Sequence, residues 1–102
     1  MSNKPLSDAQ VATEVRHLVS ANRIGWTRHA EERMALRGID KGQVKECLKK
    51  GVFTESPTIP NRSGDIEYTF RIEAIVDHET LIVAASLIPA KKVVVITVFP
   101  DK

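Results

Sequence analysis

The fold is decided by residues 65–76, which read Asp-Ile-Glu-Tyr-Thr-Phe-Arg-Ile-Glu-Ala-Ile-Val. Apolar and polar side chains alternate through this segment, and such alternation predicts a strand with one face on a core and the other toward solvent. The expected core face consists of Ile66, Tyr68, Phe70, Ile72, Ala74 and Val76. The opposite face is expected to carry Asp65, Glu67, Thr69, Arg71 and Glu73.

Further strands are expected on both sides of this segment. Turn residues at 77–79 and 89–92 predict strands over residues 81–88 and 93–99. Residues 52–55 add a short strand before a loop over residues 56–64. The last strand is apolar on both faces, which is typical of a central strand covered on both sides. Its second face would be covered by the first helix, by a partner chain or by a second copy.

Three helices are expected before the long strands. Ser7 with Gln10 forms a capping-box pattern for a first helix, and Asp40 with Gln43 does so for a third helix that ends at Gly51. The second helix is expected over residues 28–37, after Thr27 and before Gly38, while residues 23–26 form a short extended segment or turn. The inward residues are Val11, Val15, Leu18 and Val19 in the first helix, and Val44, Cys47 and Leu48 in the third.

The elements predict an α+β fold in which N-terminal helices pack on a three- to four-stranded antiparallel sheet. Residues 1–6 are expected to be a disordered tail, and residues 7–100 a single domain, since 102 residues supply one modest core. No apolar run approaches the roughly 20 residues needed to cross a bilayer, and the N-terminus lacks a signal pattern. A cytoplasmic location without membrane association is therefore expected. The lone Cys47 excludes an intrachain disulfide.

The charge is unevenly distributed although the net charge is only +2. Residues 1–50 hold ten Lys/Arg and six Asp/Glu, whereas residues 51–102 hold five and seven. This asymmetry indicates weakly that the helical half has an anionic partner.

The main candidate site lies on the second helix. His29, Arg33 and Arg37 follow one another at intervals of four residues, so they fall within an arc of roughly 80° beside Ala30 and Met34. This pattern is typical of the polar wall of a cleft. His29 lies in the first turn, where the helix dipole favours neutral imidazole, and a neutral histidine beside two arginines suits general-base chemistry near a phosphate.

A structural explanation of the same stripe remains open. The arginines of a surface helix would pair with Glu32, Glu67 or Glu73. The functional interpretation needs a second wall, for which the candidates are Arg71, Thr97 and Tyr68. Because Tyr68 and Arg71 lie on opposite faces of one strand, they line a single flat cleft only if the strand is bulged or twisted.

Other chemistry finds little support in the sequence. His17 and His78 are far from His29 and from Cys47, so no metal-ligand spacing is present and neither a metal nor another cofactor is expected. Cys47 falls on an inward helix face and is expected to be a core thiol. Five aromatic residues are too few for an extended base-stacking platform.

The second-helix motif carries a resemblance to a known family. The string His29-Ala30-x-x-Arg33-Met34-x-x-Arg37-Gly38-Ile39, followed by Gly51 and the ending Val-Ile-Thr-Val-Phe, resembles a bacterial domain family of unknown function over about residues 24–100. That family is grouped with RelE/MqsR-like toxins in the barnase–EndoU–colicin–RelE ribonuclease fold group. The resemblance implies a RelE-like α+β domain encoded beside an antitoxin.

The resemblance also implies a reaction. Within this fold group, metal-free RNA cleavage proceeds by attack of the 2′-hydroxyl and leaves a 2′,3′-cyclic phosphate. Carried onto this chain, His29 is the base or acid, and Arg33 and Arg37 bind the phosphate. Arg71 and Thr97 would form the second wall, and Tyr68 would supply an orienting hydroxyl. The near-neutral charge departs from the strongly basic ribosome-dependent type and favours free or structured RNA.

The leading hypothesis is thus a toxin-type endoribonuclease with RNA as substrate and an antitoxin-like protein or a second copy as partner. The alternative is a non-catalytic protein-interaction module with the same fold. DNA binding through the helical half is a weaker option, because a net charge of +2 is low for tight duplex affinity.

Overall fold

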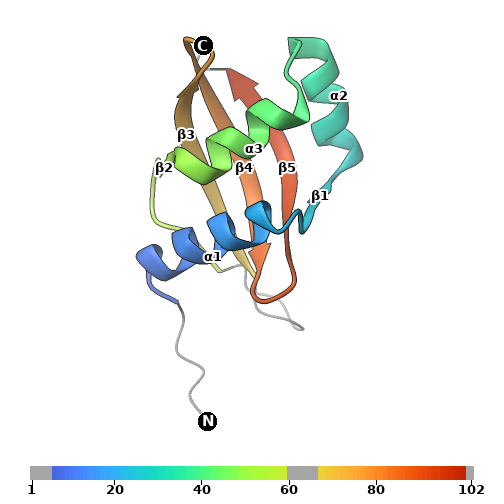
Figure 1. The fold of residues 1–102 in the computed structure, drawn as a ribbon. Coiled ribbons are helices and arrows are strands. Elements are labelled where there is room, and N and C mark those ends of the chain that lie inside the picture. Colours follow the sequence, from blue (N-terminus) through green and yellow to red (C-terminus); the bar gives the residue numbers. More distant parts are fainter. Residues whose placement is uncertain (1–5, 60–66, 101–102) are drawn as a thin grey trace.

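Three helices and five strands make up the chain in the computed structural model, which describes residues 6–59 and 67–100. The helices are α1 (Asp8–Ser20), α2 (Arg28–Arg37) and α3 (Lys41–Lys50). The strands are β1 (Ile24–Trp26), β2 (Val52–Phe53), β3 (Tyr68–Val76), β4 (Glu79–Ile88) and β5 (Lys92–Pro100). Figure 1 shows α1 and α3 lying across the sheet and α2 beside one of its edges. The expected α+β class is confirmed.

The sheet differs from the expectation in size and in strand direction. It has five strands in the order β1-β5-β4-β3-β2, and β1 runs parallel to β5 while the other pairs are antiparallel. The prediction of a purely antiparallel, three- to four-stranded sheet is therefore wrong. Ile24–Trp26 is too short to show an alternation, and its partner strand lies almost 70 residues further along the chain.

The helix boundaries follow local chemistry. Both predicted capping boxes are present, with the side chains of Ser7 and Asp40 accepting from the backbone N–H groups of Gln10 and Gln43. Gly38 ends α2 in the left-handed conformation at φ +67°, as its position predicted. The two-residue turn between β3 and β4 has positive φ at both Asp77 and His78, which is the geometry that suits a tight hairpin.

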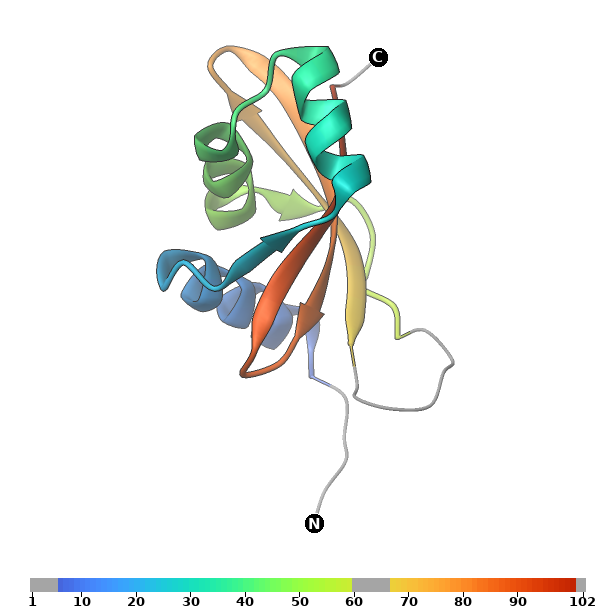
Figure 2. The ribbon, with the colours of Figure 1, turned by 90° about the vertical axis from the view of Figure 1, so that its right-hand side faces the viewer.

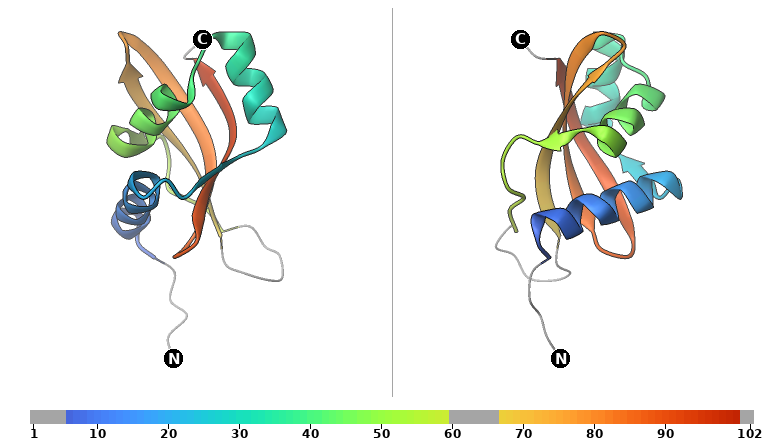
Figure 3. Two further views of the ribbon diagram at one scale, coloured as in Figure 1. Left: turned by 45° about the vertical axis from the view of Figure 1, so that its right-hand side comes forward. Right: turned by 60° about the vertical axis from the view of Figure 1, so that its left-hand side comes forward.

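One face of the sheet carries the core, under α1 and α3 (Figure 2). The predicted inward residues of both helices are buried, as are Tyr68, Phe70, Ile72 and Val76 on β3. Asp65 and Ile66 lie outside the described residues. The helix α1 lies on the same face as α3 and does not cross over (Figure 3).

The opposite, helix-free face of the sheet was expected to be covered above β5. In the described ranges no helix lies over it, and Val94, Ile96, Thr97 and Phe99 are half-buried. The first helix therefore does not supply the expected cover of this face, whereas cover by a partner chain or a second copy stays a prediction. None of the helices in residues 6–59 and 67–100 has the length and apolar character needed to span a membrane.

Candidate functional site

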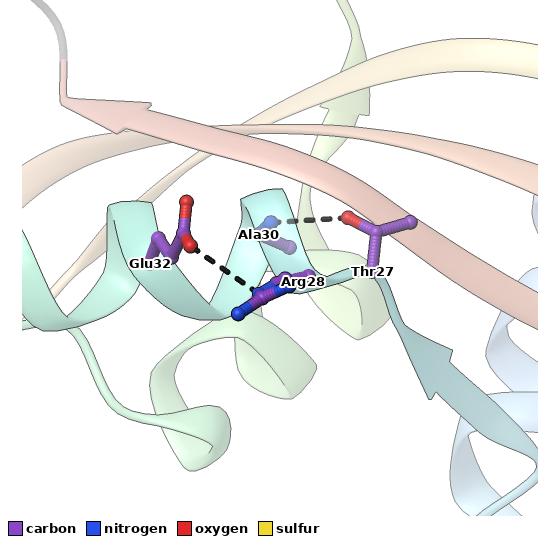
Figure 4. Close-up of polar contacts among 4 residues, drawn as sticks. All are labelled: Thr27, Arg28, Ala30 and Glu32. Atoms are coloured by element: carbon purple, nitrogen blue, oxygen red, sulfur yellow. Dashed lines mark hydrogen bonds and ion pairs between the residues drawn. The ribbon is translucent and has the colours of Figure 1, made fainter.

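The site begins at Thr27, where β1 becomes α2. The Thr27 backbone N–H donates to the Val95 carbonyl at 3.0 Å, which extends the parallel pairing by one residue. Its hydroxyl accepts from the Ala30 N–H at 3.0 Å and donates to the Ile96 carbonyl at 2.9 Å. Thr27 therefore ends the strand, caps the helix and fixes the first turn of α2 against β5 (Figure 4).

A bulge in β5 sets which of its side chains face the site. Val95 pairs with Ala85 but Thr97 pairs with Ala84, so Ile96 is an extra residue in the ladder. The extra residue leaves Val95 and Val98 both buried although they are three positions apart. Beyond the bulge, Thr97 shares the helix-free face with its neighbours across the sheet, Ala84 and Arg71.

The helix α2 covers the edge of β5 beyond the end of β1. Ala30 and Met34 are buried against the sheet and hold the helix there. The polar stripe beside them faces a groove of about 260 Å³ at the end of β5. This groove, called the α2–β5 groove below, is lined by His29, Arg33, Arg37, Thr97, Val98 and Phe99.

The cationic side chains of the α2 stripe do not form ion pairs with the carboxylates of their own helix. Arg28 Nε lies 3.6 Å from Glu32 Oε2 (Figure 4), and Lys41 Nζ lies 3.6 Å from Glu31 Oε2, so both carboxylates of α2 pair with cations outside the stripe. Within residues 6–59 and 67–100, His29, Arg33 and Arg37 have no hydrogen-bonding or ion-pairing partner for their side chains. No carboxylate lines the α2–β5 groove in that part of the chain. The groove is therefore cationic, exposed and open to an anion.

Arg71 joins the groove through Phe99. Its guanidinium carbon lies 5.3 Å from the centre of the Phe99 ring. Arg71 is on β3 and Phe99 on β5, and on the intervening strand β4 the residue that pairs with Arg71 is the small Ala84. Phe99 was absent from the sequence-based site. The sequence could have indicated Phe99, because it lies two residues after the candidate Thr97 and residues two apart on a strand share a face.

Tyr68 lies elsewhere. It is 4% exposed on the helix side of the sheet, and its hydroxyl accepts from the Leu6 backbone N–H at 2.8 Å. The structure thus brings together His29, Arg33, Arg37, Thr97 and, through Phe99, Arg71, but not Tyr68. Among the described residues no cluster of three His, Cys, Asp or Glu side chains has the arrangement of a metal site.

One of three comparisons with known proteins matches the chain to a family. Neither the curated proteins nor the solved structures contain a significant match to the chain. A family model does match residues 26–100, which span α2, α3 and strands β2 to β5 together with Trp26, and leave α1 outside. The description of that family assigns no activity. The α2–β5 groove lies wholly within the matched segment, and the chain belongs to the family described as a domain of unknown function, DUF4258.

Proposed function

We propose that this chain is a toxin-type endoribonuclease that cleaves RNA in the α2–β5 groove without a metal ion. The observation that carries the proposal is the convergence of His29, Arg33 and Arg37 on one groove that no described carboxylate lines. An imidazole beside two permanent cations is a chemically complete minimal set for attack on a phosphodiester by its own 2′-hydroxyl.

The reaction proceeds as an internal transesterification. The 2′-oxygen forms a bond to phosphorus while His29 takes its proton, and the bond from phosphorus to the 5′-oxygen breaks. The leaving 5′-oxygen takes a proton from water, and His29 later returns its proton to solvent. The products are a 2′,3′-cyclic phosphate and a 5′-hydroxyl end, so atoms and charges balance.

The other groove residues stabilise and position the phosphate. Arg33 and Arg37 project from successive turns of α2 and neutralise the charge that accumulates on the non-bridging oxygens. Thr97 supplies a hydroxyl to the same groove from the β5 side. Removal of one donor of this kind typically lowers kcat by a factor of about 100 to 1,000.

The wider setting is part of the same proposal. The α2 motif and the β-rich C-terminal half support a RelE-like relationship, and with it an antitoxin-like protein partner. The net charge of +2 supports free or structured RNA as the substrate in place of the ribosome.

The experiment incubates purified wild type, His29→Ala and Arg28→Ala with total bacterial RNA in EDTA and identifies the fragment ends. Arg28 is the matched control, because it lies on the same helix, is 92% exposed and pairs with Glu32. Cleavage to 2′,3′-cyclic phosphate ends is expected for wild type and Arg28→Ala. His29→Ala is expected to lose at least about 100-fold in rate while keeping its fold by circular dichroism. Equal rates for wild type and folded His29→Ala would contradict the proposal.

A second candidate function is a non-catalytic interaction module. It is favoured by two exposed apolar side chains on or beside the helix-free face, Val52 at 69% and Ile75 at 67%. Both lie next to Glu73, with which Val52 pairs across the strands. In this alternative the helix-free face binds an antitoxin-like protein or a second copy. Two results would support this alternative. The folded chain, freed of its partner, would cleave no RNA. It would also form a stoichiometric complex with that partner or with a second copy, and the Val52→Asp variant would not.

A further inference from the structure

The pair Phe99 and Arg71 extends the α2–β5 groove beyond the phosphate-binding stripe. Phe99 is half-buried at the end of β5, and it lines the groove together with His29, Arg33 and Arg37. The exposed Arg71 places its guanidinium over the ring at 5.3 Å. An aromatic ring and a guanidinium plane are the two protein surfaces on which unstacked nucleobases stack.

The location of the pair decides which part of a nucleic acid would meet it. Because Arg33, Arg37 and Phe99 line the same groove, a phosphate held by the two arginines would leave the base of an adjoining nucleotide within reach of the Phe99 ring or of the arginine layered on it. A base inside a duplex already has both of its faces covered by neighbours. Stacking on this pair therefore requires a base that is free of a helix.

We propose that Phe99 and Arg71 form a nucleobase subsite, which makes the α2–β5 groove selective for single-stranded RNA. The subsite deepens the proposed function and rests on it, because it presumes that the groove holds an RNA phosphate. One stacking position suits the aromatic content of the chain, which is too small for an extended platform. Stacking tolerates all four bases, so the subsite selects strandedness more than sequence.

The test uses a probe that cannot be cleaved. A short RNA with 2′-O-methyl sugars lacks the attacking hydroxyl, and a 2-aminopurine placed within it loses fluorescence when stacked. The probe is titrated with wild type, Phe99→Leu, Phe99→Tyr and Ile75→Ala, alone and annealed to its complement. Phe99→Leu keeps the apolar bulk but removes the aromatic face. Ile75→Ala is the matched control, since Ile75 is an exposed apolar side chain of the β3 strand outside the groove.

The expected result is fluorescence quenching by wild type, Phe99→Tyr and Ile75→Ala, and little quenching by Phe99→Leu. The leucine variant is also expected to bind the single strand about tenfold more weakly. The annealed probe is expected to bind all four proteins with equal affinity. This affinity should be lower than that of wild type for the single-stranded probe. Undiminished quenching by folded Phe99→Leu, or equal affinity of wild type for both forms of the probe, would overturn the subsite.

Arg71→Lys separates the stacking plane from the charge. It is expected to weaken quenching while leaving the salt dependence of binding unchanged, because lysine keeps the charge but has no planar face. Unchanged quenching would remove Arg71 from the subsite. Parallel incubation with unmodified RNA distinguishes the two proposals. Stacking without cleavage overturns the endoribonuclease alone, and cleavage by a wild type that gives no quenching overturns the subsite alone.

Discussion

Cys47 illustrates, at the residue scale, how position decides the chemistry of a side chain. It is fully buried on α3, and its thiol donates to the carbonyls of Leu81 at 3.4 Å and Ile72 at 3.6 Å. Burial removes solvent from the thiolate and raises the pKa of Cys47 from 9.0 to about 12. The expectation of a core thiol is confirmed by this burial, and a thiol with such a pKa is a poor nucleophile at neutral pH.

The raised pKa predicts a pH dependence of stability. The folded-state pKa lies above the unfolded value, so the contribution of the neutral thiol is complete below about pH 9 and is lost as the pH rises toward about 12. Within this window the free energy of unfolding should fall by up to about 1.4 kcal/mol per pH unit from this group alone. Urea unfolding of wild type and Cys47→Ala at several pH values isolates the effect, since the alanine variant lacks it. If the free energy of unfolding fell equally with pH in the two proteins, the raised pKa of Cys47 would be contradicted.

At the element scale, α2 depends on its connection to the sheet. Thr27 donates hydrogen bonds to the Val95 and Ile96 carbonyls of β5, and its hydroxyl accepts from the Ala30 N–H of α2. Because Ile96 is the extra residue of the β5 bulge, the same threonine also ties the helix to the irregularity that aims Thr97 at the groove. The site is thus built on the junction of β1, α2 and β5, and each of these elements orients a different part of it.

Thr27→Val should loosen this junction, whereas Thr27→Ser should preserve it. Valine has nearly the same shape but no hydroxyl, so the helix loses its cap and the Ile96 carbonyl loses its donor. The cost in the free energy of unfolding is expected to be about 1 kcal/mol, measured by urea unfolding. RNA cleavage should fall more in Thr27→Val than this small loss of stability explains, because the α2 stripe shifts relative to Thr97. Equal activity of folded valine and serine variants would show that the junction does not position the groove.

The elements that the sequence predicted well are those fixed by neighbouring residues. Capping at Ser7 and Asp40 and the left-handed Gly38 depend on contacts within a few positions, and the alternation over residues 68–76 is readable from consecutive side chains. The parallel pairing of β1 and the bulge in β5 depend on partners far along the chain. The candidate site shows the same division. The stripe of α2 was visible as a helical periodicity, while the contact between Arg71 and Phe99 needed the order of three strands.

At the scale of the whole molecule, positive charge is concentrated in one place although the net charge is small. The net charge of +2 is low for a nucleic-acid-binding protein, yet the α2–β5 groove gathers Arg33, Arg37 and the adjoining Arg71 beside one another. The affinity for a polyanion is set by the phosphates that such a cluster neutralises, and the remaining surface contributes little at physiological salt. The proposed binding at the groove should therefore depend on this cluster more than on the excess of acidic residues over residues 51–102.

The salt dependence of binding measures this cluster directly. Three arginines that each neutralise one phosphate of a single strand give a slope of log K against log salt concentration of about −2. Arg37→Ala should reduce the magnitude of the slope by about 0.7, and Arg28→Ala should leave it unchanged because Arg28 is paired with Glu32 outside the groove. The measurement uses the uncleavable 2′-O-methyl strand over a range of KCl concentrations. A steep slope that both variants share equally would mean that the anion binds to another surface. A slope near zero would remove phosphate binding from the groove, and with it the basis for RNA as the substrate.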